Sequence, residues 1–154
     1  MTYQTSILIG LLLAGALNAF QPRALALVCI VFFYFVLLPK LLPDPNLLGA
    51  SWFIVLIAIE LSLGYMALAT QTRAGIAVCG FSVWNCLAHL FGYYAYTSDS
   101  TWYDYYATIV RTGEVSQIIA LSLYSRPVIR LLVWWVLLHK ENDDGSLKSI
   151  GHSG

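Results

Sequence analysis

The stretch Leu121–Leu138 reads LSLYSRPVIRLLVWWVLL and places Arg126 and Arg130 inside an otherwise apolar segment. A charge at bilayer depth costs several kcal/mol on insertion scales, so a charged residue in a membrane helix needs a partner. Pro127 has no backbone N–H to donate, which predicts a kink in this helix. An alternative is that the second half of the stretch is an interfacial helix whose arginines reach the lipid headgroups.

The whole chain has the composition of a membrane protein. Of its 154 residues, 59% are hydrophobic and 10% are charged. Soluble domains carry about 25% charged residues, so this composition predicts an all-α, multi-pass transmembrane helical bundle with the lipid bilayer as partner. The formal net charge is zero and no basic run is present, so no nucleic-acid partner is expected.

Apolar runs and turn signals divide the chain into one transmembrane domain, residues 1–138, and a polar C-terminal tail, residues 139–154. The five predicted spans cover residues 4–20, 24–42, 47–70, 76–96 and 115–138. The first two runs are short for a bilayer, so an N-terminal re-entrant hairpin followed by three spans is an alternative. Gly10, Ala14 and Asn18 recur every four residues, and this small-residue edge would let another helix approach closely.

The connection at residues 97–113 is rich in aromatic residues. Thr101 and Asp104 have the spacing of a capping box. The aromatic side chains that follow Thr101 are Trp102, Tyr103, Tyr105 and Tyr106. We predict a short interfacial helix before the last span, with its rings at headgroup level. A platform for a partner or a ligand is the alternative.

The basic residues predict an orientation with the N-terminus outside and the C-terminus in the cytoplasm. The cytoplasmic side would then hold Arg23, Arg73, Lys140 and Lys148, and the outer side Lys40 and Arg111. The small size, the short polar tail and the lack of a soluble domain resemble those of small bacterial and phage inner-membrane proteins. A bacterial-type inner (plasma) membrane is therefore the expected location.

Three of the predicted spans carry polar side chains at similar depth. Glu60 and Asn85 lie near the middle of their runs, and His89 lies one turn from Asn85. Arg126 and Arg130 from the last run complete a predicted buried polar layer. In a structural interpretation Glu60 pairs with one of the two arginines. In a functional interpretation the layer lines a polar path or a binding site.

Two helical faces would carry this layer. On the fourth run, polar side chains recur at offsets of three or four residues, at Ser82, Asn85, His89, Tyr93 and Tyr96. On the last run, Ser122, Arg126 and Arg130 recur every four residues and predict a second polar face.

No catalytic or cofactor-binding motif is visible in the sequence. A haem or zinc site needs two or more ligands, and His89 is the only histidine inside the apolar runs. The chain contains no Gly-x-Ser-x-Gly elbow and no phosphate-binding loop. We therefore expect no catalytic residue, no metal and no cofactor, and an enzyme is not the favoured class.

Two classes of function fit these features. The first is a small protein that self-assembles into a homo-oligomer and forms a channel or a holin-like pore, lined by the polar faces of the last two spans. The second is a membrane-embedded accessory or regulatory subunit that docks another membrane protein. One glutamate cannot neutralise two buried arginines, and the excess positive charge favours a further partner.

Overall fold

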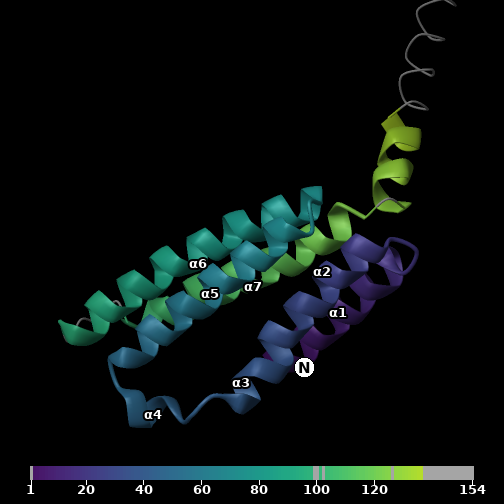
Figure 1. Ribbon diagram of the computed structural model, residues 1–154. Coiled ribbons are helices and arrows are strands. Elements are labelled where there is room, and N and C mark those ends of the chain that lie inside the picture. The colour runs from purple at the N-terminus through teal and green to yellow at the C-terminus, as the bar shows by residue number, and fades with distance from the viewer. Residues whose placement is uncertain (1, 99–100, 102, 126, 137–154) are drawn as a thin grey trace, which may run out of the picture.

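The computed structural model describes residues 2–98, 101, 103–125 and 127–136, and the regular elements in these ranges are helices (Figure 1). In chain order they are α1 (Tyr3–Asn18), α2 (Pro22–Phe32), the π-helix η1 (Phe33–Leu37), α3 (Leu38–Leu41), α4 (Pro45–Leu48), α5 (Ser51–Ala69), α6 (Arg73–Thr97) and α7 (Tyr103–Leu123). A further helix, Pro127–Val136, follows α7.

Local sequence signals set where several of these helices begin. The side chains of Thr2 and Thr72 cap α1 and α6 by accepting hydrogen bonds from backbone N–H groups at 3.4 and 2.9 Å. Pro22 is the first residue of α2, where its missing N–H is not needed. The π-helix η1 ends directly before α3, which contains Pro39. Proline has no backbone N–H, so it cannot donate the hydrogen bond that would continue a regular α-helix.

Three helical segments are long and apolar enough to cross a membrane, namely Pro22–Leu41, Ser51–Ala69 and Arg73–Thr97. A fourth candidate is the pair Tyr105–Leu123 and Pro127–Val136, which is bent by 71°. Helix α1 has 16 residues and is thus about 24 Å long, against roughly 30 Å of hydrocarbon in a bilayer. The described helices are compatible with a membrane protein, while the five spans and the interfacial helix stay predictions.

The structure differs from the sequence prediction most clearly at residues 97–113. Helix α7 begins at Tyr103 and runs through Gly113 to Leu123 as one helix, so its first half lies where we predicted a connection. Tyr106 and Gln117 point from α7 toward neighbouring helices. A hydropathy pattern assigns polar and aromatic residues to the interface whether or not other helices cover them, and this explains the difference.

Helix α7 lies in the middle of the contacts between helices. It packs against α6 and α1, α5 packs against α6 and α2, and α1 pairs with α2 (Figure 1). The small-residue edge predicted on α1 is confirmed as a helix contact, because Ala14 is fully buried and Gly10 lies against Ile118 of α7. Asn18 Nδ2 donates to the Leu121 carbonyl at 3.0 Å. The Leu121 carbonyl is near the end of α7. The Ser125 N–H, which would bond to this carbonyl in a continuing α-helix, bonds to the Ser122 carbonyl instead.

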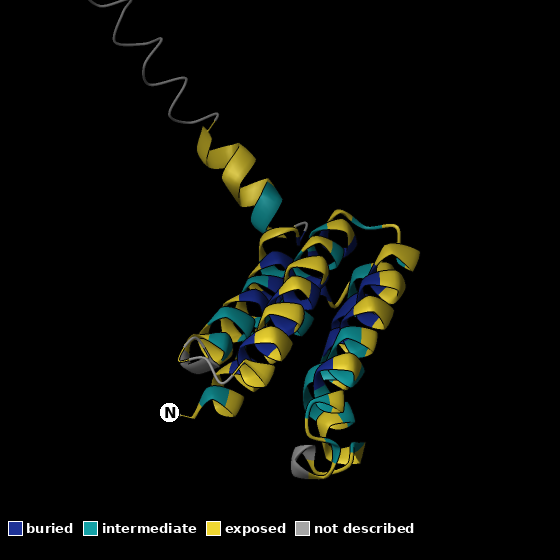
Figure 2. Cartoon of the chain, turned by 90° about the vertical axis from the view of Figure 1, so that its left-hand side faces the viewer, coloured by how far each residue is buried: buried dark blue, intermediate teal, exposed yellow. Residues whose placement is uncertain are grey.

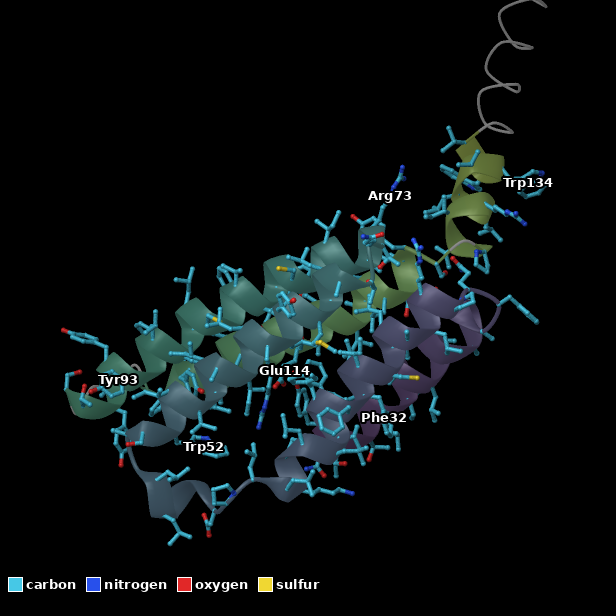
Figure 3. All side chains as sticks on the ribbon, viewed as in Figure 1. Phe32, Trp52, Arg73, Tyr93, Glu114 and Trp134 are labelled. Atoms are coloured by element: carbon cyan, nitrogen blue, oxygen red, sulfur yellow. The ribbon has the colours of Figure 1, made fainter. Side chains whose placement is uncertain are left out.

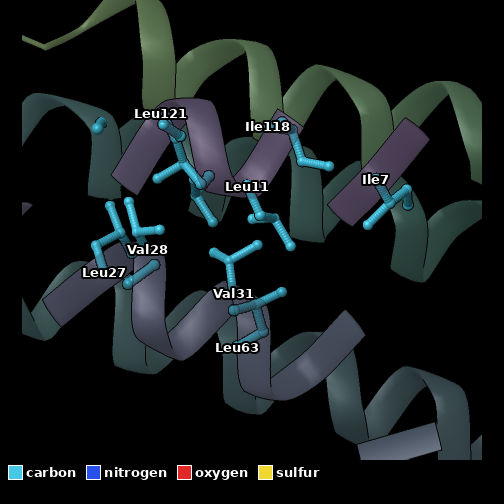
Figure 4. Close-up of a cluster of buried hydrophobic side chains, with 12 residues drawn as sticks. Ile7, Leu11, Leu27, Val28, Val31, Leu63, Ile118 and Leu121 are labelled. Atoms are coloured by element: carbon cyan, nitrogen blue, oxygen red, sulfur yellow. The ribbon is translucent and has the colours of Figure 1, made fainter. Parts of the chain in front are cut away.

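The two ends of the bundle are built differently. The end that contains the α1–α2 and α5–α6 turns, called here the closed end, is filled by aliphatic side chains such as Leu27, Leu63 and Leu121, each at most 1% exposed (Figure 4). The opposite end, called the open end, holds the start of α1, α3 and aromatic residues such as Trp52 and Tyr106. The outward faces of the helices are largely exposed in Figure 2, as expected for surfaces that contact lipid.

Candidate functional site: a polar cavity between the helices

Glu60 on α5 lies in a layer of polar side chains between the two ends. It is 5% exposed, and its Oε1 accepts a hydrogen bond of 2.9 Å from Asn85 Nδ2 on α6. Gln117 Nε2 on α7 donates to Ser82 Oγ at 2.9 Å and lies 3.4 Å from Glu60 Oε2. Side-chain amides from two helices therefore hold one buried carboxyl group.

Two glycines allow α6 and α7 to come this close. A Cβ atom at Gly113 of α7 would collide with Asn85 Oδ1. A Cβ atom at Gly92 of α6 would collide with the rings of Tyr106 and Phe53. Small residues at helix contacts are the usual means by which membrane helices pack closely, and here they set the spacing on both sides of His89.

The polar layer is not fully hydrogen-bonded. Asn85 Oδ1 and Gln117 Oε1 are buried and have no hydrogen-bond partner in the described part of the chain. A buried polar atom without a partner costs about 1–3 kcal/mol. Buried polar atoms without a protein partner need an explanation in a native structure, such as a water or ligand group that completes their hydrogen bonds.

The residues predicted from sequence are only partly brought together. Glu60, Asn85 and His89 are buried on facing helices. Arg130 is exposed on the helix Pro127–Val136, beyond the bend that follows α7. Arg126 lies outside the described residues, so its pairing with Glu60 stays a prediction. Among the described residues, the donors that face Glu60 are the side-chain amides of Asn85 and Gln117 and the hydroxyl of Ser82.

The aromatic residues that were predicted to lie at the membrane interface have different surroundings in the structure. Trp102 and the side chain of Tyr103 lie outside the described part of the structure. Tyr105 is exposed on α7. Tyr106 instead points toward α6, where its hydroxyl shares a hydrogen bond of 2.6 Å with His89 Nδ1. Pro127 is the first residue of the helix after the bend, a position that proline favours.

A cavity of about 680 Å³ borders this polar layer at the open end. Its polar lining includes Glu60, His89, Glu114, Tyr3 and Tyr106, with Lys40 of α3 also present. Its apolar lining includes Phe35 and Val36 of η1 together with Trp52 and Leu56 of α5. Figure 3 shows Glu114 and Trp52 on the side of α5 and α7 that faces α3. Segments that are far apart in the sequence thus form one cavity.

Glu114 is a second carboxyl group in the cavity lining. It accepts a hydrogen bond from the Tyr3 hydroxyl of α1, and it interacts electrostatically with Glu60. The Arg111 guanidinium lies 5.1 Å from the centroid of the Tyr3 ring, within the range of a cation–π contact. The carboxyl groups of Glu60 on α5 and Glu114 on α7 therefore line the same cavity.

Three residues of the site were missed by the sequence analysis, namely Tyr3, Glu114 and Gln117. A signal for the last one was present, because Tyr106, Val110, Gly113 and Gln117 recur at offsets of three or four residues and form one face of α7. The prediction of a connection at residues 97–113 hid this face. Tyr3 and Glu114 lay at the edges of the predicted spans, where polar residues are common.

No protein-family model, curated protein or solved structure matches the chain. Within the described residues, no group of three or more histidine, cysteine, aspartate or glutamate side chains could hold a metal ion. The class therefore rests on the fold and the site: the described residues form a helical bundle with largely apolar outer faces and a polar cavity between its helices.

Proposed function

We propose that this chain is an integral membrane protein that binds a small molecule in the cavity at its open end. The observation that carries the proposal is the cavity of about 680 Å³ that reaches Glu60, His89 and Glu114 between helices apolar enough to cross a membrane. Ionisable groups inside membrane helices are costly, and they often mark substrate, ion or proton routes.

The size and lining of the cavity support binding of a small molecule. Ligand sites in proteins typically have volumes of about 300–1,000 Å³ and are mostly apolar with a few converging polar groups. The cavity falls within this range, and its apolar walls end at a small set of polar side chains from α1, α5, α6 and α7. Such a site would orient a ligand through hydrogen bonds to its polar group and would hold its apolar part through van der Waals contacts.

The geometry favours a site within one chain over a pore between copies. Ser82 and Asn85 of the polar α6 face are buried and hydrogen-bonded to α7 and α5, and His89 is bonded to Tyr106. A pore between chains would need these groups to turn outward. The self-assembling pore and the accessory subunit stay as predictions from the sequence.

In the proposed orientation, with the N-terminus outside, the open end faces the outside. Tyr3 and α3 belong to that end, whereas Arg23 and Arg73 lie at the turns of the closed end. An excess of arginine and lysine marks the cytoplasmic side. The cavity would then receive its ligand from the outer leaflet or the external water.

Filling the cavity tests this proposal. Val110 of α7 lines the cavity, and Val110→Trp would occupy part of it. Leu87→Trp is a matched control, because Leu87 is 59% exposed on the outer face of α6. Three probes of similar shape cover the ligand classes: 2-phenylethylammonium, n-propylbenzene and 3-phenylpropionate. Binding is measured by calorimetric titration of the full chain in lipid nanodiscs, with empty nanodiscs subtracted.

We expect wild type and Leu87→Trp to bind at least one probe with similar affinity, and Val110→Trp to bind it at least roughly tenfold more weakly. The proposed function is wrong if wild type binds none of the three probes. It is also wrong if Val110→Trp, folded by circular dichroism, binds as wild type does.

A further inference from the structure

The charges that line the cavity indicate which ligand it takes. We propose that the cavity binds an organic ammonium ion with an apolar body, whose N–H groups face Glu60, Glu114 and His89 while its body contacts the aromatic wall. This inference rests on the proposed function, since it names the ligand class for the same cavity.

The deepest charged group in the cavity lining has no positive partner among the described residues. Glu60 is 5% exposed, and the hydrogen bonds to its carboxyl group come from neutral groups, namely the amides of Asn85 and Gln117 and the hydroxyl of Ser82. A buried carboxylate without a positive charge nearby is costly, so it requires a proton or a cation. The electrostatic interaction between Glu60 and Glu114 adds to this requirement, because two like charges repel.

The two positive side chains near the cavity do not remove this requirement. Arg111 is exposed, and its guanidinium interacts electrostatically with Glu114 and Tyr3. Lys40 is exposed on α3 at the edge of the cavity. Both therefore lie at the exposed edge of the cavity, away from the buried carboxyl group of Glu60.

His89 supplies a second, independent observation. Its side chain is 3% exposed and lines the cavity. Its Nδ1 shares a hydrogen bond with the Tyr106 hydroxyl, whereas its Nε2 has no hydrogen-bond partner within the described part of the chain. A histidine nitrogen in this state is a free hydrogen-bonding group beside the two carboxyl groups. A ligand with several N–H donors fits the two carboxyl groups, and His89 Nε2 accepts a further hydrogen bond in the tautomer in which Nδ1 donates to the Tyr106 hydroxyl.

The walls of the cavity favour an organic ion over an inorganic one. Aromatic rings of Tyr34, Phe35 and Trp52 line it, and such rings attract cations through their faces as well as burying apolar surface. A volume of about 680 Å³ is far larger than a bare ion needs. The site therefore combines buried negative charge with a surface for an apolar body.

The three probes separate the ligand class from the proposed function. All have the same phenylalkyl body, and they end in an ammonium, a methyl or a carboxylate group. We expect wild type to bind 2-phenylethylammonium at least roughly tenfold more tightly than the other two, because only this probe compensates the buried carboxyl groups. This comparison needs no substitution, so it is unaffected by any variant that does not fold.

Two variants then locate the charge partner. Glu60→Gln and Glu114→Gln should each weaken binding of 2-phenylethylammonium by roughly tenfold and leave binding of n-propylbenzene unchanged within about twofold. Asp44→Asn is the matched control, because Asp44 is exposed and does not line the cavity. It should bind all three probes as wild type does.

The outcomes distinguish the two proposals. If n-propylbenzene or 3-phenylpropionate binds as tightly as the ammonium probe, and Val110→Trp abolishes that binding, the cavity is a ligand site but the ammonium class is wrong. If both glutamine variants bind the ammonium probe as wild type does, the class is also wrong. If no probe binds wild type, the proposed function fails, and the inference built on it fails too.

Discussion

The closed end and the open end of this bundle show two ways of filling the space between apolar helices. At the closed end, aliphatic side chains such as Leu27, Leu63 and Val78 have no measurable exposure. At the open end the helices border a cavity lined by carboxyl, imidazole, phenol and aromatic groups. Aliphatic side chains fill the closed end by direct contact, whereas the polar and aromatic side chains of the open end border a space that they do not fill.

The polar layer around Glu60 separates the two ends, and it is the least satisfied part of the core. Its hydrogen bonds join α5, α6 and α7, yet two amide oxygens lack partners in the described part of the chain. Buried polar groups of this kind are weak evidence for stability, because replacing them with well-packed apolar groups is often neutral or stabilising. Substitutions in the layer and at the closed end can break or sharpen this comparison.

The largest effect is expected where α6 and α7 are closest. Gly113→Ala places a methyl group against Asn85 Oδ1, so either the backbone or the polar layer must shift. We expect the free energy of unfolding to fall by about 2–3 kcal/mol. Titration with sodium dodecyl sulfate in mixed micelles, followed by circular dichroism, measures this change.

Gly80→Ala is the control for that substitution. A Cβ atom at Gly80 of α6 meets nothing within 4 Å. Alanine favours helix over glycine, so this variant should be unchanged or more stable by up to about 1 kcal/mol. Equal stability of Gly113→Ala and Gly80→Ala would contradict the close contact of α6 and α7 at the polar layer.

A smaller loss is expected for Asn85→Ala, in the polar layer itself. The substitution removes the hydrogen bond to Glu60 Oε1, but it also removes the unpaired Oδ1. The net loss should be about 1–2 kcal/mol in the same unfolding titration. A loss above that of Gly113→Ala would show that the layer is a main source of stability rather than a feature kept for the cavity.

The smallest effect is expected for Asn18→Ala at the closed end. Asn18 contributes one hydrogen bond between helices, to the Leu121 carbonyl, and such bonds in a membrane protein average about 0.6 kcal/mol. Ser122→Ala is the control, because within the described residues Ser122 Oγ bonds to a carbonyl of its own helix, that of Ile118. The closed end would need to be reinterpreted if Asn18→Ala proved more destabilising than Asn85→Ala.

The sequence allowed part of the site to be predicted. The spacing of Ser82, Asn85 and His89 predicted one polar face of α6, and the structure has these residues buried. The placement of Glu60 at the depth of Asn85 agrees with their hydrogen bond. Both inferences use only helical periodicity and rise per residue, which are local properties of the chain.

Arg130 shows where such reasoning stops. Its position in an apolar run predicted a buried partner for Glu60, but a bend of 71° between α7 and the next helix leaves Arg130 exposed. Depth matching assumes a continuous helix, and the break near Pro127 removes that assumption. Gln117 takes the place beside Glu60 instead.

By itself, the amino-acid sequence determined that this is an all-helical chain with apolar helices and which face of α6 is polar, because composition and periodicity act within each helix. Only the tertiary structure decided the partners of Glu60, the inward position of Tyr106 and the cavity shared by Glu60, His89 and Glu114. These features depend on the register between helices. Close contacts between residues that are far apart in the sequence, such as Gly113 and Asn85, set this register.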